Sequence, residues 1–514
     1  MTSATAQHTV PAQQPLDGPQ ASAAARRTGR RFRPRDGRAA SALLFLLPTA
    51  AALACVLTGL GRRQLWRDEH ATWWASTLSY ADLGALIERI DVVFAPYYAL
   101  MHLWIMVAGS SPAALRLPEA LAMAVSAGLL ALIGRKLFNV RAGLLSGLLF
   151  AVLPAVTRYG QEARPYSFAM LFTLLATFLL ASVLERHTLK GWSLYALAIA
   201  LTGFSHLVAL LVVAAHAGPV LLARRGGDRI AVPAFAGAGV AGVSSLVPMA
   251  LAGAGQSAQI AWVSATTRYL ATYPTALFGS WITGGVMMAA GVVGLLMVGR
   301  HAALLVPWAV LPPLLTFLTA DRLHLFLPRY LLFTIPAWVL LAAAALTGPV
   351  GPFAGPAAAR GRRVCSLLLV VPSAVSFTLL ALPAIDSVRR DLPYEPDYAG
   401  VARIVRESQR PGDGMVFHGG LSERKAMAYE LREGARPEDV LMERAPQELG
   451  TYGAFECGRP ARCLAGTDRV WLISTVAGDP RKGMNGRTAA ALDAFEVVRT
   501  ERLPWVTVQL LSRV

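Results

Sequence analysis

Long apolar runs, separated by short arginine-bearing connections, recur over the first three quarters of the chain. A helix needs roughly 20 apolar residues to cross the hydrocarbon core of a bilayer. The run at 191–223 is too long for one such helix and has basic residues at both ends, so we expect two helices with a break near His206. The sequence therefore predicts about eleven membrane-spanning helices, within residues 39–60, 117–134, 142–157, 165–184, 191–223, 230–251, 281–299, 302–320, 330–347 and 364–385.

The amino-acid composition supports this interpretation. Hydrophobic residues make up 55% of the chain and charged residues 15%, whereas soluble domains carry about 25% charged residues. A soluble enzyme, a disordered protein, a coiled coil and a disulfide-dense secreted module are excluded. We expect an all-α polytopic membrane bundle over residues 39–385.

The net charge of +17 lies in the membrane part of the chain. Residues 386–514 hold 19 basic and 19 acidic residues, so residues 1–385 supply the whole excess. Basic residues in the short connections of an apolar region are typical of membrane topology, whereas nucleic-acid binding needs a clustered soluble patch. Nucleic acid is therefore not an expected partner, and residues 1–38 are predicted to be a disordered, basic, cytoplasmic tail.

The segment 96–108 has thirteen residues, too few to cross a bilayer, and contains two Tyr, a His and a Trp. Such residues favour the membrane interface, so we expect a helix lying in the membrane surface. If this helix does not cross, one set of basic residues falls on the cytoplasmic side, as the positive-inside rule requires. They are Arg135, Lys136, Arg141, Arg186, Lys190, Arg224, Arg225, Arg229, Arg300, Arg360, Arg362 and Arg363.

Residues 386–514 have a different character and predict a small α/β domain on the extracytoplasmic side. An amphipathic helix pattern covers 397–409, and short apolar, strand-like runs alternate with further helical patterns after it. Cys457 and Cys463, with five residues between them, can form a local disulfide if this domain faces an oxidising compartment.

Two adjacent acids, Asp68 and Glu69, lie in the first extracytoplasmic loop and are flanked by aromatic residues. A carboxylate there suits a general base that takes the proton of an acceptor hydroxyl, with its neighbour orienting it or holding a divalent metal. The alternative is a solvated loop in which Asp68 caps a helix that starts at Glu69.

A second group of polar residues is expected on the same side of the membrane and could bind a phosphate and a sugar. Arginine presents a planar set of donors that matches phosphate oxygens, and a phosphate held in this way is a good leaving group. Attack from the opposite face would invert the anomeric carbon. The alternative is that the arginines extend from helix ends towards water. The candidates are Arg116, Gln161, Glu162, Arg164, Tyr166, His206, Arg322, His324, Arg329 and Tyr330.

These motifs resemble the GT-C integral-membrane glycosyltransferases, in the branch of the bacterial protein O-mannosyltransferases and aminoarabinose transferases (glycosyltransferase family 39). The resemblance rests on five segments in order: Trp66-Arg67-Asp68-Glu69-His70, Pro96 to Trp104, Arg116-Leu117-Pro118, Tyr159 to Tyr166, and Pro328-Arg329-Tyr330.

The resemblance implies a polyprenyl-phosphate sugar donor and inverting transfer on the outer face of the plasma membrane. Asp68 matches the family's catalytic acid and Glu69 its neighbour. The chain has Ala95-Pro96 where the family often has two prolines, and Glu119 where it often has Ser. The sugar (mannose or another hexose or pentose) and the acceptor (protein, glycan or lipid) stay open.

Two other classes of protein compete with this interpretation. A transporter or flippase of lipid-linked sugars would show internal repeats and polar residues at mid-membrane, whereas here the polar residues gather on one side and no repeat is evident. A membrane scaffold that presents residues 386–514 would not need the acidic pair beside so many arginines.

Overall fold

The computed structural model describes residues 1–2, 34–263, 266–348, 356–390 and 394–514. The chain divides into two compact units, Met1–Ala42 and Leu43–Val514, and the site described below belongs to the second. Most of the predicted tail, residues 3–33, lies outside the described residues.

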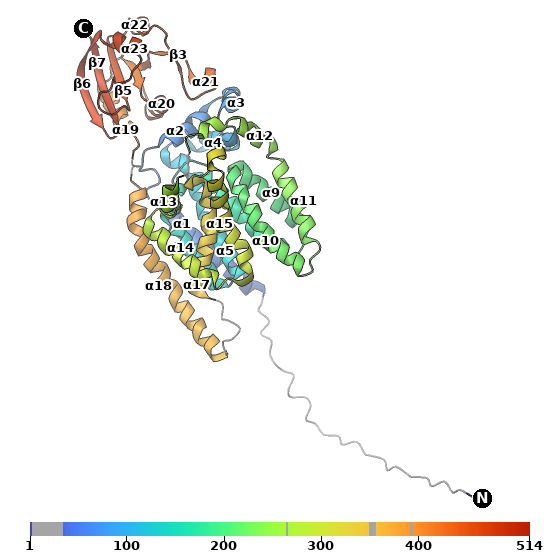
Figure 1. The fold of residues 1–514 in the computed structure, drawn as a ribbon. Helices are drawn as coiled ribbons and strands as arrows, with labels where there is room; N and C mark the ends of the chain where they lie inside the picture. Colours follow the sequence, from blue (N-terminus) through green and yellow to red (C-terminus); the bar gives the residue numbers. More distant parts are fainter. Residues whose placement is uncertain (3–33, 264–265, 349–355, 391–393) are drawn as a thin grey trace. The chain divides into compact units, whose positions relative to one another are not determined.

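Helices dominate the chain as far as residue 388 (Figure 1). In the described residues, seven helices are long and apolar enough to span a membrane, or ten if each of three bent pairs counts as one span. Helix α9, which covers the first part of the predicted run 191–223, has 17 residues and is not among these spans, so the eleventh span stays a prediction. The polytopic membrane bundle predicted from the sequence is confirmed. Its helices are α1 (Pro34–Leu57), α5 (Pro112–Leu137), α6 (Val140–Ala151), α7 (Pro154–Gly160), α8 (Tyr166–Val183), α9 (Leu189–Ser205), η2 (Leu207–Leu211), α10 (Val212–Arg225), α11 (Ala231–Ser244), α12 (Val247–Gly255), η3 (Ser257–Ile260), α13 (Thr267–Phe278), α14 (Trp281–Leu295), η4 (Gly299–His301), α15 (Ala302–Leu318), α16 (Ala320–Leu323), η5 (Pro328–Thr334), α17 (Ile335–Thr347) and α18 (Pro356–Val388).

Breaks between helices bring polar residues to the candidate site. The predicted break in 191–223 is confirmed, because α9 ends at Ser205 and His206 has extended backbone before η2 begins. Helices α6 and α7 form another bent pair, at 60°. Pro154 opens α7 and has no N–H to continue the preceding helix.

Small residues let the helices of the bundle pack closely. A Cβ at Gly143 of α6 would lie 2.4 Å from the carbonyl oxygen of Ala131 in α5, a distance that no side chain tolerates. Small residues at such contacts are typical of membrane helices, which gain little from burying apolar surface against each other.

Four short elements form the connection between α1 and α5. They are α2 (Arg67–Thr77), α3 (Tyr80–Arg89), η1 (Val92–Phe94) and α4 (Ala95–Ala108). Helix α4 corresponds to the predicted surface helix and packs against α2. Its placement in the membrane surface stays a prediction.

The C-terminal region forms the predicted α/β fold around a five-stranded sheet of order β2-β1-β5-β7-β6 (Figure 1). β1 pairs in parallel with β2 and β5, and β7 pairs antiparallel with β5 and β6. The elements are α19 (Tyr398–Ser408), β1 (Gly414–His418), α20 (Glu423–Glu430), β2 (Glu438–Asp439), β3 (Met442–Arg444), α21 (Pro446–Leu449), β4 (Phe455–Glu456), α22 (Pro460–Cys463), β5 (Arg469–Ser474), α23 (Gly486–Leu492), β6 (Phe495–Leu503) and β7 (Val506–Arg513).

Apolar side chains point to both faces of the central strands, which explains why helices cover both faces of this sheet. Successive strand side chains point to opposite faces, so Met415 packs in one cluster with α19 and α20, and Val416 in another with α23. Val401 and Val405 lie four residues apart on α19 and are fully buried in the first cluster. This amphipathic pattern is the one that predicted the helix.

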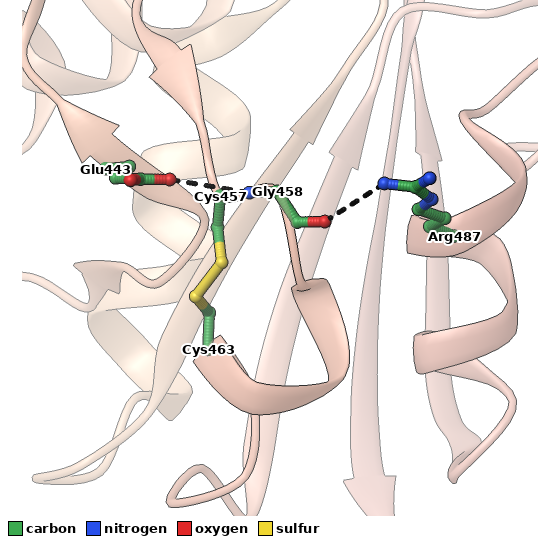
Figure 2. The surroundings of a disulfide bond; sticks show 5 residues. All are labelled: Glu443, Cys457, Gly458, Cys463 and Arg487. Atoms are coloured by element: carbon green, nitrogen blue, oxygen red, sulfur yellow. Dashed lines mark hydrogen bonds between the residues drawn. A yellow bond between two sulfur atoms is a disulfide. The ribbon is translucent and has the colours of Figure 1, made fainter.

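Cys457 and Cys463 are joined by a disulfide that holds α22 against the end of β4 (Figure 2). The Gly458 N–H donates to the Glu443 carboxylate (3.4 Å), and Arg487 donates to the Gly458 carbonyl (3.4 Å). The bridge and these two hydrogen bonds fix one short loop of the domain.

We expect replacement of both cysteines by serine (Cys457→Ser with Cys463→Ser) to lower the local stability of β3 and β4 by about 2 kcal/mol, the loop-entropy value for so short a loop. Hydrogen exchange of the strand amides in the full-length protein measures this. Cys55→Ser, which alters a free cysteine in α1, is the matched control. Unchanged exchange in the double variant would refute the prediction.

Candidate active site

The acidic pair opens helix α2. Arg67 is the first residue of the helix, so Asp68 and Glu69 lie in its first turn, where the helix dipole favours negative charge. The two side chains point to different surroundings, because adjacent residues on a helix do not share a face. Asp68 is about one quarter exposed, whereas Glu69 is fully buried.

Glu69 forms a two-pronged ion pair with Arg116 of α5. The Arg116 Nε and Nη2 atoms donate to the two Glu69 carboxylate oxygens, each at 2.7 Å. The Ala163 N–H donates to the same carboxylate at 2.9 Å. Burial raises the pKa of Glu69, but Arg116 outweighs that effect and holds it below its usual value. Glu69 is therefore a permanent anion, bonded to two separate segments.

The remaining N–H groups of Arg116 donate to backbone carbonyls in the segment between α1 and α2. Nη1 donates to the carbonyls of Leu60 (3.0 Å) and Arg63 (2.9 Å), and Nη2 donates to that of Gln64 (2.9 Å). Arg116 is fully buried. The N–H groups of Arg116 thus have partners within the protein. Arg116 and Glu69 hold parts of the site together, and the contact of Arg116 with a donor phosphate stays a prediction.

Gln161 has a similar structural role. Its side-chain amide donates to the carbonyls of Val56 (2.8 Å) and Thr58 (2.9 Å), and Arg63 donates to its backbone carbonyl (3.1 Å). These bonds fix the segment 161–164, and the contact of Gln161 with a donor stays a prediction.

Asp68 faces Arg329, which lies in η5. The Arg329 Nη2 atom is 3.6 Å from the Asp68 carboxylate. The guanidinium carbon lies 5.7 Å from the centroid of the Trp66 ring and 5.9 Å from that of Tyr330. The first loop and η5, about 260 residues apart in sequence, thus place an acid and a cation side by side between aromatic rings.

Three further predicted residues lie together beside this pair. The His206 ring is 4.7 Å from Tyr330 and 5.6 Å from Tyr166, and the two tyrosine rings are 6.2 Å apart, measured between centroids. They come from η5, the break after α9, and the start of α8. The structure therefore brings Asp68, Tyr166, His206, Arg329 and Tyr330 into one neighbourhood.

This neighbourhood contains buried polar atoms that, within the described residues, have no hydrogen-bond partner. Both carboxylate oxygens of Glu162 are in this state, together with Arg164 Nε, Tyr166 OH, His206 Nδ1 and Arg329 Nε. An unpaired buried polar group costs about 1–3 kcal/mol. Natural folds avoid that cost unless a ligand or water supplies the partner. A gathering of such atoms is typical of a binding site.

Positive charge dominates the unpaired set. Arg164 is 6% exposed, and its guanidinium carbon lies 4.1 Å from the centroid of the Phe94 ring. Tyr166 and Asp68 are among the groups whose charge acts on it. Burial raises the pKa of Glu162 to about 7, although Arg158 lowers it. Near neutral pH this acid can be protonated, so the site presents one buried cation, Arg164, and one partly exposed cation, Arg329, and favours an anionic ligand.

Two of the predicted residues lie apart from this set. Arg322 is exposed on α16, and His324 directs its Nδ1 atom to the Val263 carbonyl (2.8 Å). His324 also has left-handed backbone (φ 54°), which ends α16 and separates it from η5. The contact of Arg322 and His324 with a donor stays a prediction.

One residue of the neighbourhood was not predicted. Lys425 of α20 is 5% exposed, and its Nζ lies 4.6 Å from the Tyr452 ring. Burial lowers its pKa to about 8, while Glu423, Asp91 and Asp68 raise it. Its sequence context, Glu423-Arg424-Lys425, is that of a solvated helix face and gave no signal.

A divalent metal near Asp68 and Glu69 stays a prediction. Both Glu69 oxygens accept bonds from Arg116, so Asp68 alone of the pair has a carboxylate free for an ion. In the part of the chain that the structure describes, no group of three or more His, Cys, Asp or Glu side chains could hold a metal. No step below depends on a metal.

We expect Glu69→Gln to destabilise the protein by about 3–5 kcal/mol, because it leaves Arg116 as a buried, uncompensated charge. The midpoint of thermal unfolding in detergent measures the change. Glu88→Gln makes the same chemical change at an exposed position of α3 and should leave the midpoint unchanged. Equal midpoints for the two variants would contradict the assigned role of the ion pair.

Comparison with known proteins gives independent findings. Residues 94–252 match the model of the dolichyl-phosphate-mannose-protein mannosyltransferase family. The chain shares its fold with the crystal structure of ArnT from Cupriavidus metallidurans bound to undecaprenyl phosphate (TM-score 0.56, 15% identity) and with the same protein in the apo state (0.54, 16%). Each alignment covers 91% of this chain and 97% of the other. No curated protein sequence matches the chain.

The family match covers residues 94–252, and the ArnT structures show a shared fold. Several helices of the described residues are long and apolar enough to span a membrane. The matched region includes α4, α5 and the segment 161–164, which supply Arg116, Glu162 and Arg164 to the site. The resemblance of this chain to the GT-C integral-membrane glycosyltransferases, predicted from its motifs, is thereby confirmed.

Proposed function

We propose that this protein transfers a sugar from a polyprenyl-phosphate donor to an acceptor hydroxyl on the outer face of the plasma membrane, with inversion. The observation that carries the proposal is the set of unpaired buried polar atoms near Asp68, which includes the Nε atoms of Arg164 and Arg329. The sugar is mannose or another hexose or pentose, and the acceptor is a protein, a glycan or a lipid.

Arg164 and Arg329 suit the phosphate of the donor. Each is largely buried and retains an unpaired Nε atom. Guanidinium groups pair with phosphate oxygens through parallel hydrogen bonds. In a site from which water is excluded, they stabilise the negative charge that grows on a departing phosphate. The ArnT structure that shares this fold has undecaprenyl phosphate bound, a ligand of the same class.

Asp68 suits the general base. Its carboxylate is accessible, and Arg329 holds it at 3.6 Å in a fixed place. It takes the proton of the acceptor hydroxyl as the acceptor oxygen bonds to the anomeric carbon. The bond between that carbon and the phosphate oxygen breaks, and the phosphate leaves with the electron pair. One displacement with one base inverts the anomeric carbon.

Tyr166, His206 and Tyr330 suit the donor sugar. Their rings form a polar and aromatic wall next to the arginines. Tyr166 OH and His206 Nδ1 have no hydrogen-bond partner within the described residues, so both can bind sugar hydroxyls. The wall also keeps water from the reacting carbon, which favours transfer over hydrolysis.

The disulfide supports the outward orientation of the site. Disulfides persist in oxidising compartments outside the cytoplasm, and Cys457 and Cys463 are bonded. The C-terminal domain contacts the loop that carries Asp68, since Tyr429 OH donates to the Ser110 carbonyl (3.0 Å) and Arg67 pairs with Glu395 (3.5 Å). The C-terminal domain, which contains the disulfide, and the proposed base Asp68 therefore lie on the same side of the membrane.

We expect Asp68→Asn to lower sugar transfer from a polyprenyl-phosphate donor by about 10²–10⁴-fold, because the amide cannot take the acceptor proton. The measurement is the initial rate of transfer in reconstituted vesicles. Asp493→Asn, at an exposed position of the C-terminal domain, is the matched control. Transfer by the Asp68 variant at the wild-type rate would remove Asp68 from the mechanism.

A second prediction concerns pH. Because the pKa of Glu162 is raised to about 7, the side chain is neutral below that pH and becomes an anion above it, where it repels the donor phosphate. Binding of polyprenyl phosphate to the wild type should therefore weaken, relative to Glu162→Gln, as pH rises from 6 to 8.

The phosphate itself also ionises with pH, but this affects binding to the wild type and to Glu162→Gln equally. Its effect therefore cancels in the ratio of the two dissociation constants. If phosphate binding raises the pKa of Glu162 by one unit, the ratio changes by up to about tenfold. A ratio that stays constant over this range would show that Glu162 does not face the phosphate.

A further inference from the structure

A cavity lies between the connection that joins α1 to α5 and the C-terminal domain. Its volume is about 550 Å³, within the range of roughly 300–1,000 Å³ typical of small-molecule sites. One wall is residues 61–64 with the start of α5, and the other is formed by α19 and the end of α20. None of the residues predicted from the sequence to bind a donor lines it.

Hydrogen bonds across the cavity fix its walls to each other. The Gln64 side chain donates to the Pro396 carbonyl (2.9 Å) and accepts from the Ala399 N–H (3.3 Å). Tyr429 OH donates to the Ser110 carbonyl (3.0 Å). A cavity whose walls are held in this way is already formed before a ligand arrives, which lowers the cost of binding.

The lining is polar and its charges nearly balance. Its charged residues are four cations and three acids: Arg62, Arg63, Arg406, Arg432, Asp397, Glu430 and Glu433. Arg63 is the most buried of them, and its guanidinium donates to the carbonyls of Val388 and Gln161. A nearly balanced lining does not suit a polyphosphate or a strongly basic peptide, and so polar a lining does not suit a lipid tail.

Neighbouring carboxylates and guanidinium groups match a ligand with many hydroxyls. A hydroxyl both donates and accepts, so a pair of adjacent hydroxyls can donate to a carboxylate and accept from a guanidinium. Arg432 also lies 3.9 Å over the ring of Tyr429. This contact holds the guanidinium plane in place at the cavity wall.

The cavity adjoins the helix that carries the proposed base. The Glu430 carboxylate lies 3.9 Å from the Nε2 atom of His70, which is two residues from Asp68 on α2. Both His70 ring nitrogens are fully buried and, within the described residues, have no hydrogen-bond partner. On the other wall, Gln64 is two residues from Trp66, whose ring packs near Arg329. The segment from Gln64 to Asp68 thus connects the cavity to the reaction site.

We propose that this cavity binds a neutral saccharide, the part of the acceptor beyond the unit that receives the sugar. The acceptor is then a glycan, and the C-terminal domain supplies half of the site that selects it. This inference rests on the proposed function.

The test is direct binding of neutral trisaccharides of mannose, arabinose and glucose to the full-length protein in nanodiscs, by calorimetry without donor. We expect at least one to bind. Arg62→Gln and Glu433→Gln, each at an exposed position, should weaken that binding by about tenfold, the loss of one charge-assisted hydrogen bond. Glu496→Gln on β6 lies outside the cavity and is the matched control.

Three outcomes would overturn the proposal: no trisaccharide binds, both cavity variants bind as tightly as the wild type, or a neutral peptide rich in serine and threonine binds there instead. Thermal unfolding midpoints show that the variants fold. Binding of polyprenyl phosphate to the wild type is measured in parallel. Its absence would refute the proposed function and the acceptor role with it, whereas its presence without saccharide binding refutes this inference alone.

Discussion

The buried ion pair between Glu69 and Arg116 is the interaction on which the site depends. It joins three segments that are distant in sequence: the start of α2, the first turns of α5, and residues 161–164, through the Ala163 N–H. A buried ion pair is stable only when its remaining hydrogen-bonding capacity is satisfied, and the carbonyls of Leu60, Arg63 and Gln64 satisfy it here. Asp68 is next to Glu69 in the sequence, and Arg164 is next to Ala163. The ion pair therefore holds the segments that carry Asp68 and Arg164 close to each other at the candidate site.

The candidate site contains two kinds of buried polar group: those that are hydrogen-bonded within the protein and those with unpaired atoms. Glu69, Arg116 and Gln161 are fully bonded and rigid, whereas Arg164 and Arg329 keep atoms without partners within the described residues. Rigid surroundings hold the unpaired groups where a ligand must meet them, so no reorganisation is needed when charge develops on a phosphate. The unfavourable free energy of burying polar atoms without partners thus arises at the candidate site, where binding of a donor would offset it.

The sequence predicted the architecture well, because apolar run length and amphipathic periodicity reflect local physics. The break at His206 and the helix at 398–408 followed from these patterns. Residue roles were harder to predict. Every arginine in the first 330 residues looks alike in sequence, so nothing distinguished Arg116, which is bonded to Glu69, from Arg329, which faces Asp68. Lys425 was missed because only the packing of α20 on α2 buries it.

The most direct test of the central claim is an experimental structure of the full-length protein with polyprenyl phosphate bound. The account predicts phosphate density within hydrogen-bonding distance of the Arg164 and Arg329 guanidinium groups, on the side that Asp68 faces. Phosphate density elsewhere, out of reach of both guanidinium groups, would contradict it.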